Sequence, residues 1–341
     1  MNYVTIIDIA KELGISKSTV SRALSGDSAN VKPETVKLVL ETAQRMGYHR
    51  NELAINLRKK SSHTIGIIIP EIVTPFFMTF ANEAQKCFNK AGYRVMVAIS
   101  NEDAAQERAN IEMFEQSRVD GIIISVCHDN ANKDLYERII SQGTPMVFFD
   151  RKVEGINASQ VVTDDYIMSF FLVEHLIRMG CRRIVHLAGP KHVRNSVARR
   201  LGYRDALEKF RIGYDPNYVI CGGLSDEEGN QAMRQFIEKG LEFDAVFAFT
   251  EKSALGAKTA LQKIGFHIPQ RVALACMSGT ALSTLVHPTL TAVEQPFTAM
   301  AEHSCRILLE HIDNPEAAVE NVVLRGETVF RESTPPLQSS R

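Results

Sequence analysis

Short apolar runs alternate with amphipathic stretches along the chain from about residue 64 to residue 280. Each run has the length of one strand and is apolar throughout, as in parallel strands that are buried on both faces. In the stretches between the runs, apolar residues recur at the helical period. This alternation predicts an α/β fold in which helices cover both faces of parallel sheets. The expected strands are residues 64–70, 94–100, 121–125, 146–150, 183–188, 245–249 and 272–277.

The body is too rich in strands for one compact sheet. About ten strands are expected, which is more than one twisted open sheet usually holds, so two similar lobes are predicted. The expected helices are residues 77–91, 105–116, 165–179, 198–210, 227–239 and 253–264. Ligands of open α/β sheets bind outside the carboxyl ends of the strands. Candidate contacts therefore lie in segments 71–77, 125–128, 150–151, 164–165, 189–199, 250–251 and 278–280.

A different pattern occupies the first 48 residues, where three short amphipathic helices are expected. Thr5 and Asp8 have the spacing of a capping box, so a helix begins directly after Thr5. Gly14 supplies a turn residue, and Ser16 is a good N-cap for a second helix. Pro33 suits the first position of a third helix. The expected helices are residues 6–13, residues 17–24 and a stretch from residue 33 up to Gly47.

The first two of these helices form a helix-turn-helix unit, because they are short and joined by a tight turn that contains glycine. Such a unit places the start of its second helix against base edges in the major groove of DNA. The outer face of the expected second helix carries Lys17, Ser18, Ser21 and Arg22, which can contact phosphates and bases. The alternative is an ordinary helical hairpin with a solvated polar face.

Residues 49–60 follow this head and leave two interpretations open. Asn51 is a good N-cap for about two helical turns, and a helix of that length is marginal in water. Leu53 and Leu57 lie four residues apart and have no obvious local core. The segment is either a partly ordered linker or a hinge helix that forms only on DNA. Such a hinge helix would pair with its symmetry mate and insert an apolar side chain into the minor groove.

The charge of the chain divides near residue 60. The whole chain has 341 residues, 45% of them hydrophobic, and a net charge of −1. Residues 1–60 carry 10 basic and 6 acidic residues, whereas the remainder carries 29 basic and 34 acidic residues. A basic head on an acidic body is typical of a protein whose small domain meets a polyanion.

Other features narrow the class of protein. The six cysteines are scattered without a C-x-x-C pair, which argues against a disulfide scaffold or zinc finger and fits a reducing cytosol. The N-terminus lacks the basic region of a signal peptide, and no run of about 18 apolar residues could span a membrane. No phosphate-binding glycine motif follows a strand, and neither a G-x-S-x-G elbow nor an H-E-x-x-H motif occurs. We therefore expect no enzyme, no metal site and no cofactor.

Three pairs of residues at the expected carboxyl ends have both a functional and a structural interpretation. Phe76 and Phe77 either stack on a ligand ring or pack as the start of a helix. Asp150 and Arg151 either hold a ligand or form a loop ion pair. Arg199 and its neighbour open a helix, where a cation gains nothing from the dipole, so a functional role competes with plain solvation.

The residues of the head resemble a known family. VTIIDIAK at 4–11, GISKSTVSRAL at 14–24 and MGY at 46–48 closely resemble the DNA-binding head of LacI/GalR-type bacterial repressors, as do Asn51, Ala54, Leu57 and Arg58. The resemblance continues through the body and covers essentially the whole chain. The matching segments there are 65–70 with 75–77, 150–151, 174–177 with 180–184, 187–190, 199 with 202–203, 254–257 and 288–296.

The resemblance implies a dimeric cytoplasmic repressor. Its core would have the periplasmic-binding-protein type I fold, with two lobes joined by three crossings near 160–163, 288–292 and 318–322. The implied division is a helix-turn-helix domain at 1–48, a hinge helix and linker at 49–62, and an effector-binding and dimerisation core at 63–341. The first lobe would comprise 63–161 and 291–319, and the second 162–290 and 320–332.

The resemblance also assigns roles within the head. The DNA partner would be a near-palindromic double-stranded operator. Lys17, Ser18 and Arg22 would contact its bases. Leu57 would be the minor-groove wedge, with Ala54 and Arg58 in the same segment. The residues that would hold phosphates or position the head are Thr5, Ser16, Ser21, Thr35, Tyr48 and Asn51.

A small effector, such as a sugar, sugar acid or sugar phosphate, would bind between the lobes. The candidate contacts are Phe76, Phe77, Ser125, Asp150, Arg151, Arg199, Glu251, Ser278 and Gln295. Two positions depart from the family. Thr250-Glu251 stands where Asn-Asp is common, and Ser278-Gly279 stands where a carboxylate usually meets sugar hydroxyls.

The missing carboxylate leaves Arg199 less balanced, which suggests an anionic effector that engages Arg199 and Arg151. A degenerate pocket with altered or lost induction is the alternative. The competing function for the whole chain is a cytoplasmic sugar-binding or enzymatic α/β protein with an incidental helical head.

Overall fold

The computed structural model describes residues 4–25, 31–48, 61–72, 75–128 and 131–335. The chain divides into two compact units, Met1–Ser62 and His63–Arg341, and each unit is described separately. In these ranges, no helix is long and apolar enough to cross a membrane.

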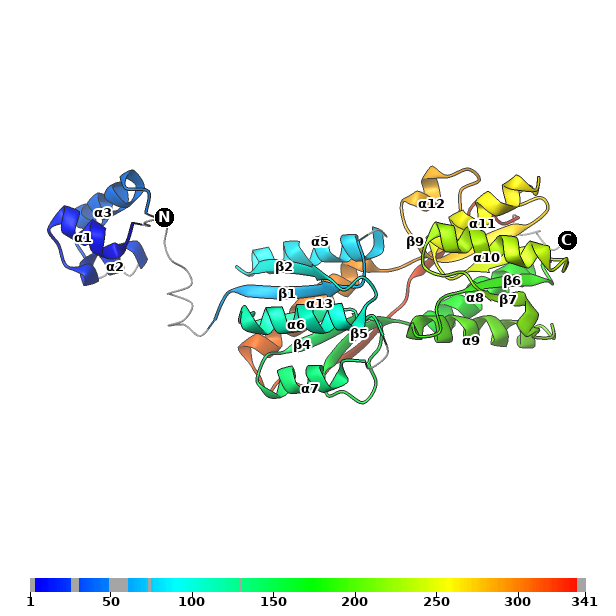
Figure 1. The fold of residues 1–341 in the computed structure, drawn as a ribbon, viewed down its shortest axis with the longest axis horizontal. Coiled ribbons are helices and arrows are strands. Elements are labelled where there is room, and N and C mark those ends of the chain that lie inside the picture. The colour runs from blue at the N-terminus through cyan, green and yellow to red at the C-terminus, as the bar shows by residue number, and fades with distance from the viewer. Residues whose placement is uncertain (1–3, 26–30, 49–60, 73–74, 129–130, 336–341) are drawn as a thin grey trace. The chain divides into compact units, whose positions relative to one another are not determined.

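The first unit contains three helices around a small core. They are α1 (Ile6–Leu13), α2 (Lys17–Ser25) and α3 (Pro33–Arg45) (Figure 1). The capping box forms as predicted, because the Asp8 carboxylate accepts a hydrogen bond of 2.8 Å from the amide of Thr5. Gly14 ends α1 with a left-handed φ of 65°, which glycine adopts without a steric cost. The buried core residues are Ile9, Ala10, Val20, Ala23, Val39 and Ala43.

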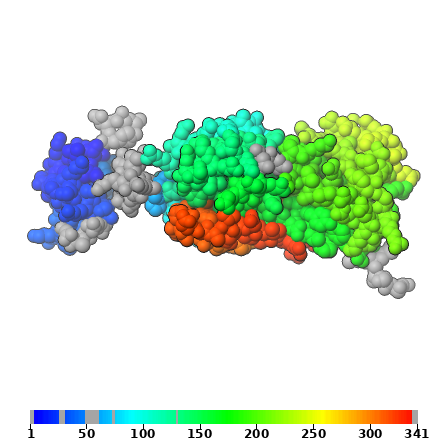
Figure 2. Space-filling model, turned by 90° about the horizontal axis from the view of Figure 1, so that it is seen from below, coloured from blue at the N-terminus to red at the C-terminus, as the bar shows by residue number. Residues whose placement is uncertain are grey.

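The second unit begins with a six-stranded parallel sheet in the order β11-β5-β4-β3-β1-β2. Its strands are β1 (Thr64–Ile69), β2 (Arg94–Ile99), β3 (Gly121–Ile124), β4 (Met146–Asp150), β5 (Ser159–Thr163) and β11 (Asn321–Leu324). Helices α5 (Pro75–Lys90) and α13 (Phe297–Asp313) pack on one face. Helices α6 (Ala104–Gln116) and α7 (Lys133–Ser141) pack on the other. Figure 2 shows α13, in orange, at the surface of this first lobe.

The second lobe repeats this plan with a sheet in the order β12-β10-β9-β8-β6-β7. Its strands are β6 (Ile184–Ala188), β7 (Val219–Cys221), β8 (Ala245–Ala248), β9 (Ala273–Gly279), β10 (Thr291–Glu294) and β12 (Glu327–Val329). Only β12 pairs in the antiparallel direction within the described residues. Helices α10 (Asp226–Glu238) and α11 (Glu251–Lys263) cover one face, and α8 (Asp165–Arg178) and α9 (Arg194–Lys209) cover the other (Figure 1). Two short elements complete the lobe: η2 (Pro216–Tyr218) and α12 (Leu282–Leu285).

Two glycines allow the helices of the second lobe to approach closely. A Cβ atom at Gly256 of α11 would lie 2.0 Å from the carbonyl oxygen of Asp226 in α10. A Cβ atom at Gly202 of α9 would lie 2.4 Å from the carbonyl oxygen of Tyr166 in α8. Any larger side chain would push these helices apart, and the starts of α9 and α11 supply residues of the site described below.

The crossings between the lobes differ from those expected. The chain leaves the first sheet after Thr163, returns from the second sheet after Glu294, and leaves the first sheet again after Leu324. The expected crossings at 288–292 and 318–322 are therefore wrong, because β10 belongs to the second sheet and β11 pairs with β5. The expected lobe limits at 161, 290 and 319 move accordingly. Strands of four residues carry too short a pattern to be separated from a crossing segment.

Candidate functional site

The exposed face of α2 carries the polar residues that the sequence assigns to DNA contacts. Val20 and Ala23 face the core, while Lys17, Ser18 and Arg22 are exposed. Neither Lys17 nor Arg22 forms an ion pair with another described residue, so both charges remain available to a polyanion. The start of the helix is fixed by Ser16, whose Oγ accepts a hydrogen bond of 3.1 Å from the amide of Thr19.

The other residues assigned to the head have mixed surroundings. Thr5 is exposed at the N-cap of α1, and Thr35 is half-buried in the first turn of α3. Tyr48 packs against the head core, and its amide donates to the Ala43 carbonyl at 2.9 Å. Ser21 is half-buried on α2. The assignments to Asn51, Ala54, Leu57 and Arg58 lie outside the described residues.

A cavity of about 340 Å³ in the second unit is lined by residues of both lobes. It lies at the carboxyl ends of the parallel strands, where the sequence predicts ligand contacts. Eight of the nine candidate effector residues line it. The ninth, Ser125, is fully buried beside the cavity, and its hydroxyl lies 3.5 Å from the Asp150 carboxylate. The eight are Phe76, Phe77, Asp150, Arg151, Arg199, Glu251, Ser278 and Gln295.

The phenylalanine pair both packs and borders the cavity. Phe76 and Phe77 are each 6% exposed, and their rings meet edge to face with centroids 4.7 Å apart. Phe76 also contacts Phe297, and Phe77 contacts Phe149. The two rings therefore belong to the first lobe's core and also form part of the cavity wall.

Arg151 pairs chiefly with Glu102, and its Nε lies 3.8 Å from the Asp150 carboxylate with which a loop ion pair was the structural interpretation. Its guanidinium makes a bidentate contact with Glu102, with N–O distances of 2.7 and 2.5 Å. It also donates to the carbonyl oxygens of Val126 and Cys127. These partners occupy Nη1 and one N–H of Nη2, so the charge of Arg151 is already paired with Glu102.

The charge of Arg199 is paired with the Asp165 carboxylate, a partner that the resemblance to the family did not indicate. The side chain is 2% exposed, and its Nε donates to Asp165 Oδ1 at 2.6 Å. Its Nη1 donates to the carbonyl of Phe249 at 2.5 Å. The sequence suggested that Arg199 is less balanced than in the family, and in the structure the first residue of α8 supplies a carboxylate to it. Nη2 makes no hydrogen bond within the described ranges and remains free for a ligand.

Asp150 is a buried acceptor at the boundary of the two lobes. It has a left-handed φ of 63° and is 6% exposed. Its Oδ1 accepts a hydrogen bond of 3.2 Å from Asn195 of the second lobe. Burial raises the pKa of Asp150 to about 6, against the opposing charge of Arg151. The carboxylate is thus ionised at neutral pH and can accept from a ligand hydroxyl.

This raised pKa predicts a pH dependence of stability. The folded chain protonates Asp150 below about pH 6, whereas the unfolded chain keeps this carboxyl ionised down to about pH 4. Folding of the wild type is therefore favoured as the pH falls from 7 to 5. Relative to Asp150→Asn, we expect the wild type to gain about 1 kcal/mol between these pH values. Urea unfolding of both proteins measures this difference, and an identical pH response would contradict it.

The Glu251 carboxylate forms hydrogen bonds with neighbouring protein groups. Its Oε1 accepts from the Thr280 amide at 3.0 Å and from the Ser283 hydroxyl, and its Oε2 accepts from the Thr280 hydroxyl at 2.5 Å. These bonds tie the start of α11 to the turn after β9. Glu251 lines the cavity, and its contact with an effector stays a prediction.

Gln295 has a buried side-chain amide whose hydrogen-bonding groups are unsatisfied. It is 4% exposed, and neither its side-chain oxygen nor its nitrogen has a hydrogen-bond partner. A buried amide without partners costs free energy, and a ligand in the cavity would supply both. Gln295 also lies on the second crossing between the lobes, where a ligand contact can influence their arrangement.

Several residues of this cavity were not selected from the sequence. Glu102 follows the strand at 94–100, so the carboxyl-end rule covers it, but nothing in the sequence shows that it pairs with Arg151. Lys252 lines the cavity from the first turn of α11. A cation in that position gains nothing from the helix dipole, which is the same signal that marked Arg199. Lys252 is half-buried and forms no ion pair with another described residue.

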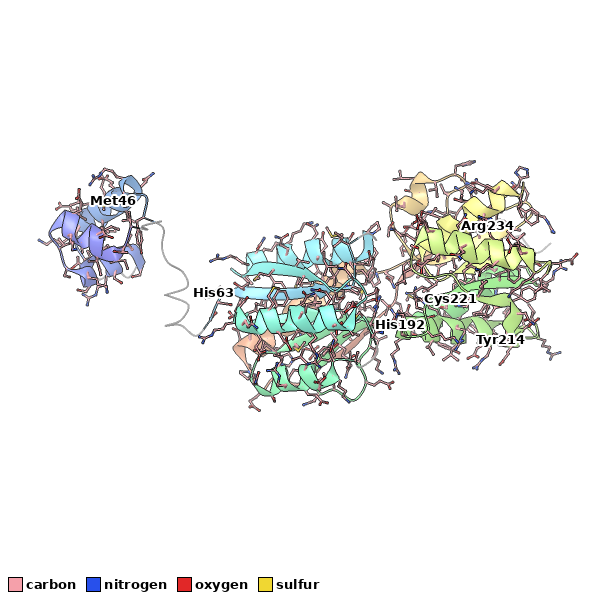
Figure 3. The ribbon with its side chains drawn as sticks, viewed as in Figure 1. Met46, His63, His192, Tyr214, Cys221 and Arg234 are labelled. Carbon is pink, nitrogen blue, oxygen red and sulfur yellow. The ribbon has the colours of Figure 1, made fainter. Side chains whose placement is uncertain are left out.

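Among the described residues, the segment at 192–195 makes contacts with the first lobe away from the crossings. One is a hydrogen bond, one an ion pair and one a ring stack with centroids 4.2 Å apart. The pairs are Asp150 with Asn195, Glu154 with Arg194, and His128 with His192, whose position Figure 3 labels. This segment therefore holds the second lobe against the first beside the cavity.

The chemistry of the lining suits binding rather than catalysis. Five acidic and three basic residues line the cavity, with phenylalanine rings between them. Free acceptors and donors at Asp150, Gln295 and Arg199 match a ligand whose groups both donate and accept hydrogen bonds. No group of three or more metal-ligating side chains occurs in the described part of the chain.

Comparison with known protein families divides the chain as its fold does. Residues 5–51 match the family described as bacterial regulatory proteins, lacI family. Residues 62–312 match the family of periplasmic binding proteins and the sugar binding domain of the LacI family. The first match shows that the helical head is not an incidental hairpin.

Individual relatives extend over nearly the whole chain. The catabolite control protein A of Priestia megaterium is 30% identical over 333 residues, which cover 97% of this chain and 99% of that protein. The ribose operon repressor of Halalkalibacterium halodurans is 29% identical over 330 residues, or 97% of each protein.

Solved structures agree with the predicted fold. The transcriptional regulator CelR in complex with cellobiose has a TM-score of 0.74 at 25% identity, covering 97% of this chain and 99% of that one. The lac repressor dimer bound to operator and the anti-inducer ONPF has a TM-score of 0.87 at 23% identity, covering 98% and 99%. The two-lobed core and helix-turn-helix head are therefore confirmed. The chain belongs to the LacI family of bacterial regulatory proteins and is a DNA-binding transcriptional regulator rather than an enzyme.

Proposed function

We propose that this regulator is a cytoplasmic repressor of a carbohydrate-catabolism operon. The observation that carries the proposal is the exposed face of α2, where Lys17 and Arg22 are without ion-pair partners among the described residues. Two such heads in a homodimer would bind the two halves of a near-palindromic operator. The relatives that are repressors of sugar operons support this function.

For the effector, we propose a neutral polyhydroxylated molecule of sugar type. Arg151 and Arg199, on which an anionic effector would depend, are already paired with Glu102 and Asp165. Carboxylates outnumber cations along the cavity wall, so an anion would meet a net negative lining. A sugar offers hydroxyls to Asp150 and Gln295 and an apolar face to the phenylalanine edges. Binding with unequal affinity for two lobe arrangements would change the affinity for DNA.

This proposal assigns a function to each segment of the chain. Residues 1–48 would bind DNA, residues 49–62 would connect the head to the core, and residues 63–341 would bind effector and form the dimer. The lobe limits within the core are those set by the crossings after Thr163, Glu294 and Leu324.

Fluorescence anisotropy on the DNA upstream of the protein's own gene tests the DNA-binding part. We expect binding that depends on sequence and weakens steeply with salt, because two basic heads release counterions from phosphates. A chain limited to residues 63–341 is the control and should show no such binding. Equal affinity of the full chain for a scrambled fragment would refute the repressor function.

Calorimetric titration tests the effector class. Matched sets of a neutral sugar, its uronic acid and its phosphate ester are titrated into the full chain. We expect the neutral member of a set to bind most tightly and Gln295→Ala to weaken it. Tighter binding of the acid or the phosphate would contradict the proposal of a neutral effector and favour an anionic one.

A further inference from the structure

A second cavity, of about 380 Å³, lies in the second lobe apart from the lining of the effector cavity. It opens at the carboxyl ends of β6 and β7 and is closed on one side by α9. In parallel α/β sheets this end of the strands is where ligands bind. None of the residues that line the second cavity lines the first.

The charge of this cavity has one sign. Its charged lining residues are Lys191 and Arg200, and no carboxylate is among its lining. Neither cation forms a hydrogen bond or an ion pair with another described residue, and both side chains are exposed. Residues 61–341 carry more acidic than basic residues, so a cavity whose charged lining residues are both cations departs from the rest of the core. A cleft of one charge focuses the field on a ligand of the opposite charge.

The remaining walls define the shape of a suitable ligand. Val197, Pro216 and Val219 give an apolar surface, and the half-buried Tyr214 adds an aromatic ring. The Tyr214 hydroxyl makes no hydrogen bond in the part of the chain that is described. Figure 3 labels Tyr214 and Cys221, which approach the cavity from the segment that ends in β7. These walls suit a ligand that carries an organic group beside its charge.

The two cavities lie on different faces of α9. Asn195 and Arg199 face the effector cavity, whereas Ser196 and Arg200 face the second one. Arg199 is buried and neutralised by Asp165, while the adjacent Arg200 has no such partner within the described residues. The same helix thus places one arginine in a structural ion pair and leaves the next one open to a ligand.

We propose that the second cavity binds a small organic phosphate through Lys191 and Arg200. Two unpaired cations match the double negative charge of a phosphate ester, and the planar guanidinium of Arg200 can donate two parallel hydrogen bonds to it. The site is independent of the effector cavity and adds a second ligand to the regulator.

Titration of the full chain with inorganic pyrophosphate at constant ionic strength tests this site. We expect saturable binding by calorimetry, and at least a tenfold loss of affinity in both Lys191→Glu and Arg200→Glu. The matched control is Arg234→Glu, because Arg234 of α10 is an exposed arginine that lines neither cavity (Figure 3). This control should bind like the wild type.

A second control separates the two cavities. Lys252→Glu removes the half-buried cation of the effector cavity and should leave pyrophosphate binding unchanged. Loss of binding in Lys252→Glu, with retention in Arg200→Glu, would place the anion in the effector cavity and overturn the proposal. Absence of saturable binding by the wild type, or equal losses in Arg200→Glu and Arg234→Glu, would overturn it as well. Circular dichroism of each variant confirms that it is folded.

Discussion

Arg199→Met is expected to lower the free energy of unfolding of the core by about 3–5 kcal/mol. The substitution removes the partner of Asp165, whose side chain is 5% exposed, and leaves its carboxylate buried without a counter-charge. Burial already raises the pKa of Asp165, and Arg199 is the group that opposes this rise. Urea denaturation of the full chain at pH 7 measures the loss.

The neighbouring arginine supplies the control for this experiment. Arg200→Met changes an exposed side chain without an ion pair in the described ranges and should alter stability by less than about 0.5 kcal/mol. The double variant Arg199→Met, Asp165→Asn should recover part of the loss, because it no longer contains a buried unpaired charge. Equal losses of stability in Arg199→Met and Arg200→Met would show that the ion pair of Arg199 with Asp165 does not stabilise the fold.

The same ion pair removes the main argument that the sequence offered for an anionic effector. Replacement of the usual carboxylate after β9 by Ser278 and Gly279 suggested that Arg199 is less balanced than in the family. The sequence contains Asp165 at the carboxyl end of β5, but the pairing of residues 34 positions apart depends on how the lobes fold. Once the pair is formed, the cavity lining has no surplus of positive charge, which is why we propose a neutral effector.

The regular elements were the most predictable part of the fold. The three head helices and the seven apolar strands follow from hydrophobic period and caps, and α1 and β4 have the predicted limits. Helices α7, α12 and α13 and the strands β5, β7, β10, β11 and β12 were not predicted. A strand such as β11, with alternating half-exposed residues at the edge of a sheet, has neither the length nor the apolar run that marks the central strands.

The position of the effector cavity could be predicted from the sequence, but the role of each residue that lines it could not. The carboxyl-end rule located the cavity, because parallel strands direct all these ends to one side. It could not show that Arg151 and Glu251 are occupied by protein partners, since hydrogen bonds between distant segments are absent from local sequence patterns. Gln295 was a candidate contact from the resemblance, and only the structure shows that its buried amide has no partner.

Arg22→Ala is expected to weaken operator binding more than any other single change in the described head. An arginine that contacts a guanine contributes about 1–3 kcal/mol to recognition, and a dimer loses that contact in both half-sites. The combined loss corresponds to about 2–6 kcal/mol, or at least a thirtyfold rise in Kd. The fold should be unaffected, because Arg22 is exposed and forms no ion pair within the described residues. Anisotropy at fixed salt on the operator measures the change.

The control variant is Lys37→Ala on α3, which removes a basic side chain that is 79% exposed and 4.0 Å from Glu41. It has the same charge change as Arg22→Ala, so it reports the purely electrostatic cost of one positive charge per head. If Arg22 reads a base, Arg22→Ala must also reduce discrimination at one symmetric pair of operator positions. An equal loss on operator and random DNA would instead assign Arg22 to the phosphate backbone and leave base reading to Lys17 and Ser18.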